Sequence, residues 1–569
     1  MSKVTRIVLL WNQSNTFGLS QDAALIEAAL ETQESFDLGS IEFVKVDPLQ
    51  PPCPADIVIH LEVPNPVWLP WAPVQIWMVN PEWCSPNWLS LCERFSQVWV
   101  KEMSRVEEFG SKATHIPWAV RGPLKPVNQS ALGLRQALWI LGASQNKHIA
   151  ARALLPIWPS DFPLTVTSTL EESALPGSFP PSVTIKRGFL EASELEELNR
   201  NSATHVCISA AEGFGFTAAQ AEARSAAMIL NTLPVYKEYY GDAKYVGFLK
   251  TPCKKEEKNH VGFLADFSYV TTENIKSALQ AIPSGEQQVE NSESRWKEFK
   301  CIIQKKVTRL LNNAKPLARM PPMLTQADCP PISVLTLTYN RRNFIDLAFL
   351  NLLITDYPKD KIQWVVVEDS DDPSKGVLDK IKAFETREPG FEITYVPMTT
   401  KRSIGYKRNK AVQYAKHGIC VNMDDDDVYP SSSFRRRVAW LQAFPNAQVV
   451  GCTMIAMYDL QKGISAVNTP PWALPQCQRV SEASFCFWKT YALEHPFPDQ
   501  QQSEGEAFIP EGPAFLEIPP QQILVALNHG TNTSGRVIAG RAQTGCFWGW
   551  DKKFITWLHG LVGVQVEAV

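Results

Sequence analysis

The central stretch of the chain reads Cys420-Val421-Asn422-Met423-Asp424-Asp425-Asp426-Asp427-Val428-Tyr429-Pro430, so four consecutive carboxylates follow a short apolar run. These charges repel one another unless a positive charge lies among them. A divalent cation prefers oxygen ligands, and a short apolar run is typical of a buried strand. The stretch therefore predicts a metal site at a strand end, with a solvated acidic turn as the alternative for an isolated charge run.

Length and composition limit the class of protein. With 569 residues the chain is too long for one core and fits about three or four domains. The formal net charge of -4 gives no reason to expect nucleic acid as a partner. No apolar run reaches the length of a signal peptide or a spanning helix, and the 12 cysteines lack CxxC spacing. We therefore expect a cytoplasmic protein with reduced cysteines and no transmembrane segment.

Three other stretches beyond residue 331 also bring polar groups to the end of a predicted element. Apolar strands over residues 332–338 and 362–367 lead into Thr338-Tyr339-Asn340-Arg341 and Glu368-Asp369-Ser370-Asp371-Asp372. Residues 400–411 place several cations and a glycine before a helix. An open α/β sheet binds its ligands along the carboxyl edge of its strands, so these stretches predict a ligand with phosphate groups at that edge.

In this order, the four stretches resemble the motifs of the inverting glycosyltransferases of family 2, over about residues 332–430. The resemblance implies a GT-A domain, a nucleotide-sugar donor, expected to be a UDP-sugar, and Mn²⁺ or Mg²⁺ as cofactor. A cation and guanidinium groups hold the leaving diphosphate in such chemistry. Either Glu368 or Asp369 is expected to read the pyrimidine edge. The resemblance implies that Asp424 and Asp426 bind the metal, and that the donor is contacted by Thr338, Tyr339, Arg341, Glu368, Asp369, Gly405, Arg408, Asp424 and Asp425.

The catalytic base and a third metal ligand are expected beyond the acidic run. The family places an acidic pair where this chain has Ser503-Glu504-Gly505-Glu506, so Glu506 is the preferred base and Glu504 the second choice. Two exposed loop glutamates are the alternative. In some members of the family a histidine joins the metal, which implies this role for His529, with a structural histidine as the alternative.

The first half of the chain alternates short apolar strands with helix-length segments, which favours parallel sheets covered on both faces. Residues 208–221 resemble the Ser-x-x-Glu-Gly-Phe-Gly signature of the retaining glycosyltransferases of family 4, which have the GT-B fold. The resemblance implies that Glu212 contacts a donor sugar and acts in catalysis, and that the glycines let the backbone approach a diphosphate. The family's second acid is replaced by Gln220. The implied donor-binding residues of this half are Gly213, Gly215, Gln220 and Lys147.

Together these patterns predict an α/β protein in which a GT-B-like pair of Rossmann-like units precedes a GT-A domain. The expected boundaries are 1–125 and 126–314 for the two units, 315–331 for a proline-rich linker, and 332–569 for the GT-A domain. The expected function is sugar transfer to a glycan or other hydroxyl acceptor, inverting and metal-dependent in the C-terminal domain, with a second, retaining transferase in the N-terminal half.

Three alternatives remain open. One is a single active GT-A domain with a degenerate GT-B scaffold or carbohydrate-binding module. Another is a carbohydrate-binding or scaffold protein in which both sites are degenerate, and the intact basic and acidic motifs beyond residue 331 speak against it. The third is a nucleotidyltransferase that uses the acids for two metals, which predicts a glycine-rich phosphate loop near the first strand. The chain has Arg341-Arg342-Asn343-Phe344 there instead.

Overall fold

The computed structural model describes residues 4–15, 18–31, 40–122, 124–132, 136–256, 258–282, 289–315, 320–509, 512–533 and 542–564. The chain forms two compact units. Unit 1 comprises Met1–Gln50, Ala55–Asn65 and Ala72–Pro316, and unit 2 comprises Pro51–Pro54, Pro66–Trp71 and Leu317–Val569. The last division, after Pro316, falls within the stretch predicted as a linker.

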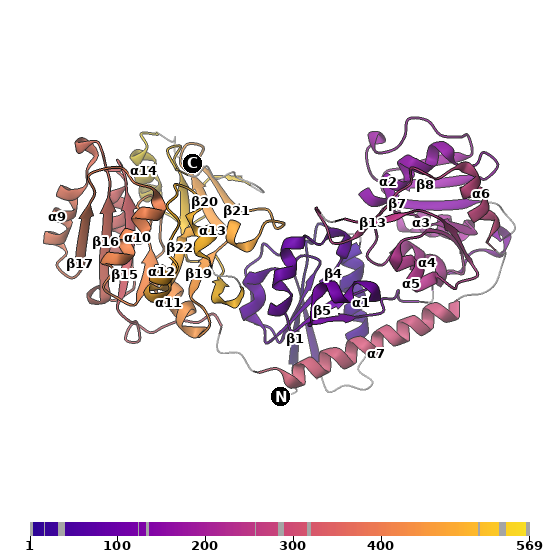
Figure 1. Cartoon of the computed structure of the whole chain (residues 1–569), viewed down its shortest axis with the longest axis horizontal. Coiled ribbons are helices and arrows are strands. Elements are labelled where there is room, and N and C mark those ends of the chain that lie inside the picture. The colour runs from indigo at the N-terminus through magenta and orange to yellow at the C-terminus, as the bar shows by residue number, and fades with distance from the viewer. Residues whose placement is uncertain are drawn as a thin grey trace. The chain divides into compact units, whose positions relative to one another are not determined.

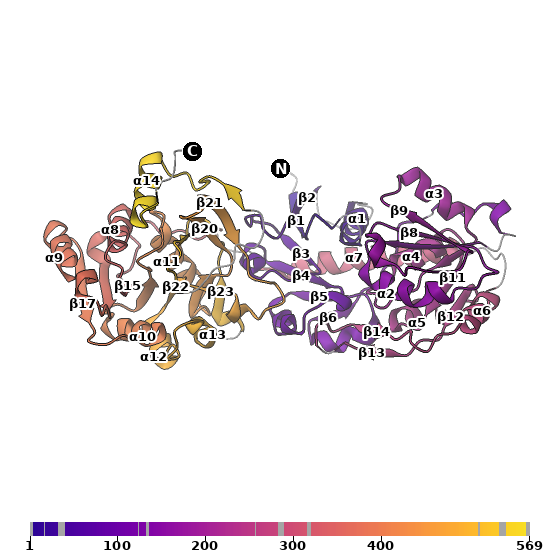
Figure 2. The same ribbon diagram turned by 90° about the horizontal axis from the view of Figure 1, so that it is seen from above.

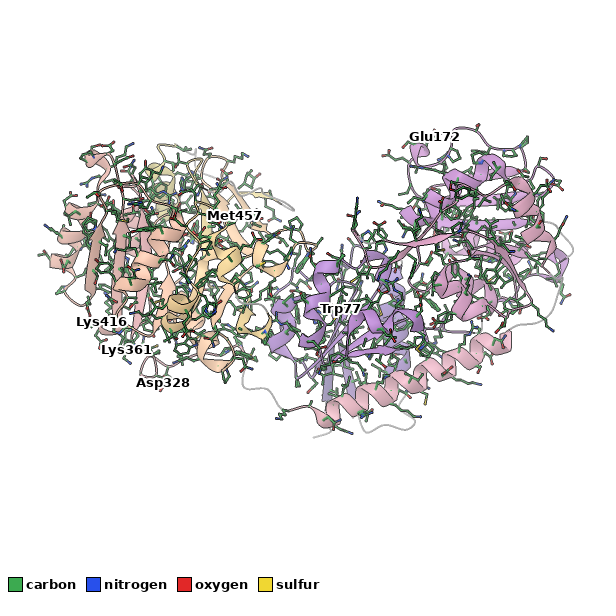
Figure 3. The ribbon with its side chains drawn as sticks, in the orientation of Figure 1. Trp77, Glu172, Asp328, Lys361, Lys416 and Met457 are labelled. Atoms are coloured by element: carbon green, nitrogen blue, oxygen red, sulfur yellow. The ribbon has the colours of Figure 1, made fainter. Side chains whose placement is uncertain are left out.

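Unit 1 begins with a six-stranded parallel sheet in the order β2-β1-β3-β4-β5-β6. Every residue of β3 and β4 is buried, as continuous apolar strands require in a sheet covered on both faces. Trp77 of β4 lies inside this half (Figure 3) and packs edge-on against Phe109. The elements are β1 (Val4–Leu10), α1 (Gly18–Glu31), β2 (Ser40–Val46), β3 (Ile57–Leu61), β4 (Val74–Val79), β5 (Gln97–Val100) and β6 (Ala113–His115).

Short 3-10 helices, instead of the helix-length segments expected from the sequence, connect the later strands of this sheet. They are η2 (Pro81–Trp83), η3 (Pro86–Arg94) and η4 (Met103–Phe109). Pro81 begins η2 and Pro86 begins η3, where the missing N–H is not needed, and Pro86 prevents η2 from continuing as a longer helix.

The second half of unit 1 is another six-stranded parallel sheet, in the order β12-β11-β10-β7-β8-β9. Its elements, with the hairpin that follows, are β7 (Ala137–Gly142), α2 (Gln145–Leu154), β8 (Leu164–Ser168), β9 (Val183–Arg187), α3 (Ala192–Asn201), β10 (Thr204–Val206), α4 (Phe216–Ala223), β11 (Ala227–Asn231), α5 (Pro234–Tyr240), β12 (Val246–Leu249), β13 (Cys253–Lys255), β14 (Phe263–Ala265) and α6 (Thr272–Gln280).

The long helix α7 (Val289–Asn313) closes unit 1 by packing against both halves (Figure 1). Phe299, Ile303 and Val307 are fully buried in the same core as the first sheet and α1. Arg295 of α7 forms an ion pair of 2.6 Å with the buried Glu222 of α4 in the second half. The last helix of the unit therefore supplies part of the core of its first sheet.

Unit 2 contains a seven-stranded sheet in the order β17-β16-β15-β18-β22-β19-β23 (Figures 1 and 2). The first four strands in that order are parallel, and β22 runs antiparallel to both β18 and β19. The elements are β15 (Ile332–Thr338), α8 (Ile345–Ile354), β16 (Ile362–Glu368), α9 (Leu378–Arg387), β17 (Glu392–Pro397), α10 (Ile404–Tyr414), β18 (Ile419–Asn422), α11 (Ser433–Ala443), β19 (Val449–Cys452), β22 (Ser481–Trp488), α12 (Lys489–Glu494), α13 (Glu504–Phe508) and β23 (Phe515–Glu517).

A smaller sheet, in the order β24-β20-β21-β25, and the helix α14 (Lys552–Leu561) complete unit 2. Its strands are β20 (Ile455–Asp459), β21 (Ile464–Asn468), β24 (Val525–Asn528) and β25 (Gln543–Thr544). Among the helices that the structure describes, none combines the length and the apolar character that crossing a bilayer requires.

The α/β class with parallel sheets is thus confirmed, and the fold fixes where the predicted strand ends of unit 2 lie. Because β16, β15 and β18 are parallel neighbours, their carboxyl ends meet at one edge of the sheet. That edge carries Glu368, Thr338 and the start of the acidic run.

Candidate active site at the carboxyl edge of the sheet in unit 2

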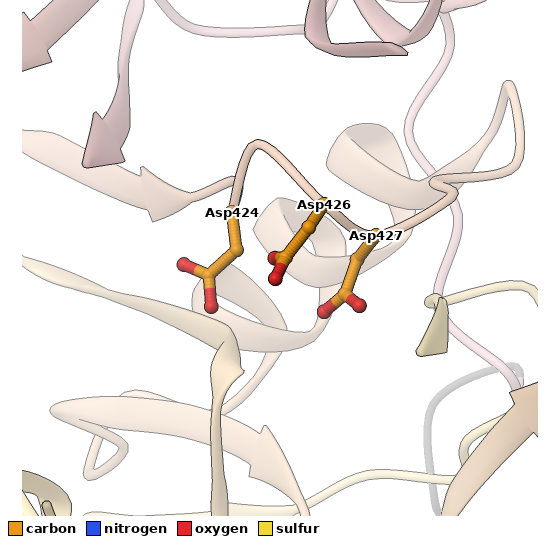
Figure 4. A group of neighbouring side chains, drawn as sticks. All are labelled: Asp424, Asp426 and Asp427. Carbon is orange, nitrogen blue, oxygen red and sulfur yellow. The ribbon is translucent and has the colours of Figure 1, made fainter. Parts of the chain in front are cut away.

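The acidic run forms a tight loop directly after β18. Side-chain oxygens of Asp424, Asp426 and Asp427 lie within 4.8 Å of one another. Figure 4 shows the three side chains pointing to the same side of the loop. Three carboxylates this close form a donor set of hard oxygens, which suits Mg²⁺ or Mn²⁺. The residues present therefore fit the predicted metal.

Arg341, from the loop after β15, supplies the positive charge nearest to these acids. Its Nη1 lies 3.0 Å from Asp425 Oδ1 and 2.6 Å from Asp426 Oδ2. Asp425 is fully buried, and burial raises its pKa to about 6, while Arg341 acts in the opposite direction. The guanidinium thus offsets part of the repulsion that the sequence predicts for four adjacent carboxylates.

His529, just after β24, lies against the same loop and is only 3% exposed. Its Nε2 is 2.9 Å from Asp426 Oδ2, and its Nδ1 is 2.8 Å from Thr531 Oγ1. The hydroxyl of Thr531 thereby fixes the orientation of the ring, as a second partner usually does for a metal-binding histidine. The structure brings the predicted ligands Asp424, Asp426 and His529 together and adds Asp427.

Glu368 and Asp369, the two acids at the end of β16, have different surroundings. The Glu368 carboxylate accepts hydrogen bonds from Val377 N, Ser370 Oγ and Tyr395 Oη, so it holds the following loop in place. Asp369 accepts from Lys407 Nζ at 2.7 Å and from Arg402 N at 2.8 Å. Asp369 thus connects the end of β16 with the start of α10.

Tyr339 and Asn340 hold the loop after β15 against the loop after β16. Tyr339 Oη donates to Asp371 at 2.8 Å, and Asn340 Nδ2 donates to the other oxygen of that carboxylate at 2.6 Å. Lys401 Nζ lies 4.1 Å from the centroid of the Tyr339 ring, within the range of a cation–π contact. The loop predicted to bind the nucleotide base is therefore held in place by hydrogen bonds and carries the Tyr339 ring, and Thr338, which precedes it, is buried.

Gly405 has a packing role that the sequence did not reveal. A Cβ at this position would overlap the carbonyl oxygen of Pro498, and Gly405 N donates to Gln500 O at 3.1 Å. The residue that the resemblance assigns to the approach of a diphosphate thus lets the start of α10 pack against the backbone of residues 498–500.

Arg408 of α10 joins two groups of acids. Its Nε donates to Glu504 Oε1 at 2.8 Å, and its Nη1 lies 3.6 Å from Asp424 Oδ1. Glu504 is 4% exposed, whereas Glu506 is exposed and accepts from Gln478 Nε2 at 2.7 Å. A third glutamate, Glu482 of β22, accepts from Gly505 N at 3.1 Å. The two predicted bases, Glu504 and Glu506, therefore have different partners. Glu482 is half-buried, and the charges of Glu504 and Arg408 act on it.

In unit 1, Glu212 lies in the loop before α4 and Lys147 in the first turn of α2; the resemblance assigns both residues to the binding of a donor. Lys147, in the first turn of α2, lies 3.3 Å from Thr217 Oγ1 in the first turn of α4. Burial raises the pKa of Glu212, and the charge of Lys147 opposes this rise. Gln220 donates to Gln21 Oε1 at 3.3 Å, and Glu222 is engaged with Arg295 and Tyr245.

Protein atoms fill the space above the two glycines of this motif. A Cβ on Gly213 would lie 2.6 Å from Glu82 Oε2, and a Cβ on Gly215 would overlap the ring of Tyr236. Gly215 also has a φ of 85°, which favours glycine. Close packing explains why both positions are glycine in this structure, and a left-handed turn explains it further at Gly215, while their role in donor binding remains a prediction.

Three residues of these clusters are not among the residues predicted from the sequence: Lys407, Glu482 and Glu82. Asp427 belongs to the acidic run predicted as a metal site but is not named there as a ligand. Lys407 is one of the cations of residues 400–411 and pairs with Asp369, so its place in that stretch could have identified it as a site residue. Glu82 precedes Glu212 by 130 positions, and burial together with the charge of Glu212 raises its pKa to about 8. No local sequence pattern marks Glu82 or Glu482.

Comparison with known proteins finds a family model that matches part of the chain. Residues 333–485 match the family model described as Glycosyl transferase family 2. A search of curated proteins gives no match. The match lies within unit 2 and supports a glycosyltransferase there, as the resemblance implied, while the resemblance of unit 1 to family 4 remains a prediction.

Two solved structures illustrate the similarity. The mannosyltransferase PcManGT from Pyrobaculum calidifontis, in complex with GDP-Man and Mn²⁺, is 19% identical over 37% of this chain and 60% of its own, with a TM-score of 0.29. TarS 1-349 from S. aureus, in complex with UDP-GlcNAc, is 18% identical over 36% of this chain and 61% of its own, with a TM-score of 0.27. The chain thus spans about three fifths of the length of these structures.

Proposed function

We propose that unit 2 transfers a sugar, with inversion, from a nucleotide-diphosphate donor to a hydroxyl group of a glycan or glycoconjugate, in glycan biosynthesis. The observation that carries this proposal is the convergence of the Asp424–Asp427 loop, Arg341 and Arg408 at the carboxyl edge of β15 and β18. A diphosphate that leaves with negative charge needs this combination of cation ligands and guanidinium groups.

The loops after β15 and β16, which hydrogen bonds hold together, suit the binding of the donor's nucleoside. The half-buried ring of Tyr339, held by Asp371, offers a stacking surface, and Lys401 beside it suits a phosphate or a base carbonyl. Asp369 is the better placed of the two acids to order this region, because it fixes both Lys407 and the backbone of Arg402. We propose a UDP-sugar as donor, with Glu368 shaping the loop.

Asp424, Asp426, Asp427 and His529 are the residues that would hold Mn²⁺ or Mg²⁺. A bound cation would neutralise charge on the diphosphate and favour its departure. Arg408 would contribute a second positive charge next to the diphosphate, since its guanidinium lies between Asp424 and Glu504. Arg341 keeps Asp425 and Asp426 ordered. We place the reaction in the cytoplasm, in keeping with cysteines that the sequence predicts to be reduced.

The test is a panel of nucleotide sugars offered to the full-length protein, with hydroxyl acceptors, in the presence of Mn²⁺, Mg²⁺ or EDTA. We expect release of a nucleoside diphosphate from at least one donor, dependent on cation, and a product with inverted anomeric configuration by NMR. A retained configuration would contradict the inverting mechanism. Release of pyrophosphate from nucleoside triphosphates instead would favour a nucleotidyltransferase.

A second, weaker nucleotide site in unit 1 is favoured by the pairing of Lys147 with the first turn of α4, next to Glu212. It would be either a retaining transferase site or a relic in a scaffold. Calorimetry on the full-length chain should then give two nucleotide sites. Gln220→Glu should tighten the weaker one about fivefold to tenfold, because a charge-assisted hydrogen bond is about twice as strong as a neutral one.

Glu212→Ala should weaken the same site without changing the melting temperature of the chain. A single site per chain that responds to neither substitution would make unit 1 a scaffold or a carbohydrate-binding module. The exposed residue Glu171, changed to Gln, is the matched control in the same half.

A further inference from the structure

The carboxylate of Glu482 occupies the volume of a side chain that Gly505 lacks. A Cβ built on Gly505 would lie 2.6 Å from Oε1, 2.8 Å from Cγ and 3.0 Å from Cδ of Glu482. The same Oε1 accepts a hydrogen bond from Gly505 N at 3.1 Å. A strand, β22, therefore delivers a carboxylate to the place where the first turn of α13 would otherwise present a side chain.

Two hydrogen-bonded links attach this position to the acidic loop. Asn422 Nδ2, at the end of β18, donates to the backbone oxygen of Glu482 at 2.8 Å. Tyr429 Oη accepts from Asp424 N at 2.9 Å and donates to Ala483 O at 3.1 Å. Glu482 and Asp424 are therefore held on neighbouring strand ends, and each lies beside Arg408.

The three glutamates Glu482, Glu504 and Glu506 differ in what their carboxylates are free to do. Glu504 is buried and bound to Arg408, so its charge holds the guanidinium. Glu506 is exposed and bound to Gln478. Glu482 is half-buried, and only one of its carboxylate oxygens is engaged by Gly505 N. It is thus fixed in position and still reachable from solvent.

The electrostatic surroundings of Glu482 suit a proton acceptor. Burial and the charge of Glu504 raise its pKa to about 7, and Arg408 opposes the rise. A general base is most effective when its pKa lies near the working pH, because it is then both deprotonated and basic.

We propose that Glu482, rather than Glu504 or Glu506, is the general base of the transfer reaction proposed for unit 2, on which this inference rests. The acceptor hydroxyl gives its proton to the Glu482 carboxylate while its oxygen forms the new bond to the anomeric carbon. The bond from that carbon to the diphosphate oxygen breaks, and its electron pair leaves with the nucleoside diphosphate beside Arg408. The products are the glycosylated acceptor, the nucleoside diphosphate and one proton.

The test compares Glu482→Gln, Glu504→Gln and Glu506→Gln in the full-length protein, with the exposed Glu494→Gln as control. Gln keeps the hydrogen bond from Gly505 N, so Glu482→Gln should fold normally. We expect its kcat for transfer to fall about 10²–10⁴-fold, with its donor dissociation constant, measured by calorimetry, close to that of the wild type. Glu504→Gln should instead weaken donor binding, because it releases Arg408.

A rescue experiment separates a need for the carboxylate from a structural role. Glu482→Ala clears the volume next to Gly505, and adding Gly505→Asp puts a carboxylate into it from α13. The double variant should transfer more than ten times faster than Glu482→Ala alone, which is about 1.4 kcal/mol of barrier. If Glu482→Gln fails to fold, this comparison still tests the proposal. Equal transfer rates for Glu482→Ala and the double variant would overturn it.

Other outcomes separate the inference from the function beneath it. A Glu482→Gln protein that transfers at the wild-type rate, or that loses donor binding and transfer equally, overturns the role of Glu482 alone. Loss of transfer with intact donor binding in Glu506→Gln only would return the role to Glu506. A wild-type protein that turns over no nucleotide sugar removes the proposed function, and this inference with it.

Discussion

Asp426→Asn should lower sugar transfer about 10³-fold or more. The substitution keeps the shape of the side chain but removes an anionic oxygen ligand, and metal-assisted stabilisation of a leaving group contributes several kcal/mol. The effect on folding should be small, because the lost contacts with Arg341 and His529 are offset by weaker repulsion from Asp425. Donor turnover with increasing Mn²⁺ and a thermal melt of the same sample measure both effects.

Asp360→Asn, an identical change at an exposed position of unit 2, is the control and should leave transfer unchanged. EDTA should reduce the wild type to the level of Asp426→Asn, and added Mn²⁺ should restore the wild type only. Full activity in EDTA, or in Asp426→Asn, would show that no metal is needed at this loop.

Arg408→Met should be damaging both to activity and to stability. Methionine has a similar length but no charge, so Glu504 loses its buried partner and the diphosphate loses a guanidinium. Breaking a buried ion pair on one side costs about 3–5 kcal/mol, and transfer should fall about 10²–10³-fold. Urea unfolding and steady-state kinetics on the same preparation measure the two losses.

The stability loss of Arg408→Met should depend on pH. Glu482 has a pKa of about 7 in the folded protein against a usual value of 4.5, so its contribution favours the folded state below about pH 4.5 and is lost as the pH rises to about 7. Removing Arg408 raises this pKa further, so the gap between variant and wild type should widen above pH 7 and narrow in acid. A constant gap would mean that Arg408 does not act on these carboxylates; Arg387→Met, at an exposed site, is the control.

The part of the site that could be predicted from the sequence lies at the ends of parallel strands. Apolar runs of the right length identified β15, β16 and β18, and parallel pairing then brings Thr338, Glu368 and Asp424 to one edge. The prediction for His529 needed family resemblance, since nothing in its local pattern points to Asp426, 103 positions away.

The rest could not be predicted because it depends on antiparallel pairing and on close packing. Glu482 lies in an apolar strand whose partner, β18, ends 60 positions earlier, and only the register of the pair places it beside the end of β18, where the acidic run begins. The resemblance assigns Gly405, Gly213 and Gly215 to the approach of a ligand, and the structure shows that each also packs against protein atoms. A sequence does not distinguish a glycine needed by a substrate from one needed by a neighbouring carbonyl, carboxylate or ring.

The helix α7 has a consequence for how the protein is made. The ribosome completes the first sheet of unit 1 about 200 residues before it completes α7, yet Phe299, Ile303 and Val307 belong to that sheet's core. During synthesis the nascent sheet must therefore keep an apolar face without its native cover until the second sheet has also emerged. The first half of unit 1 thus reaches its native packing only after α7 has been made, although it leaves the ribosome first.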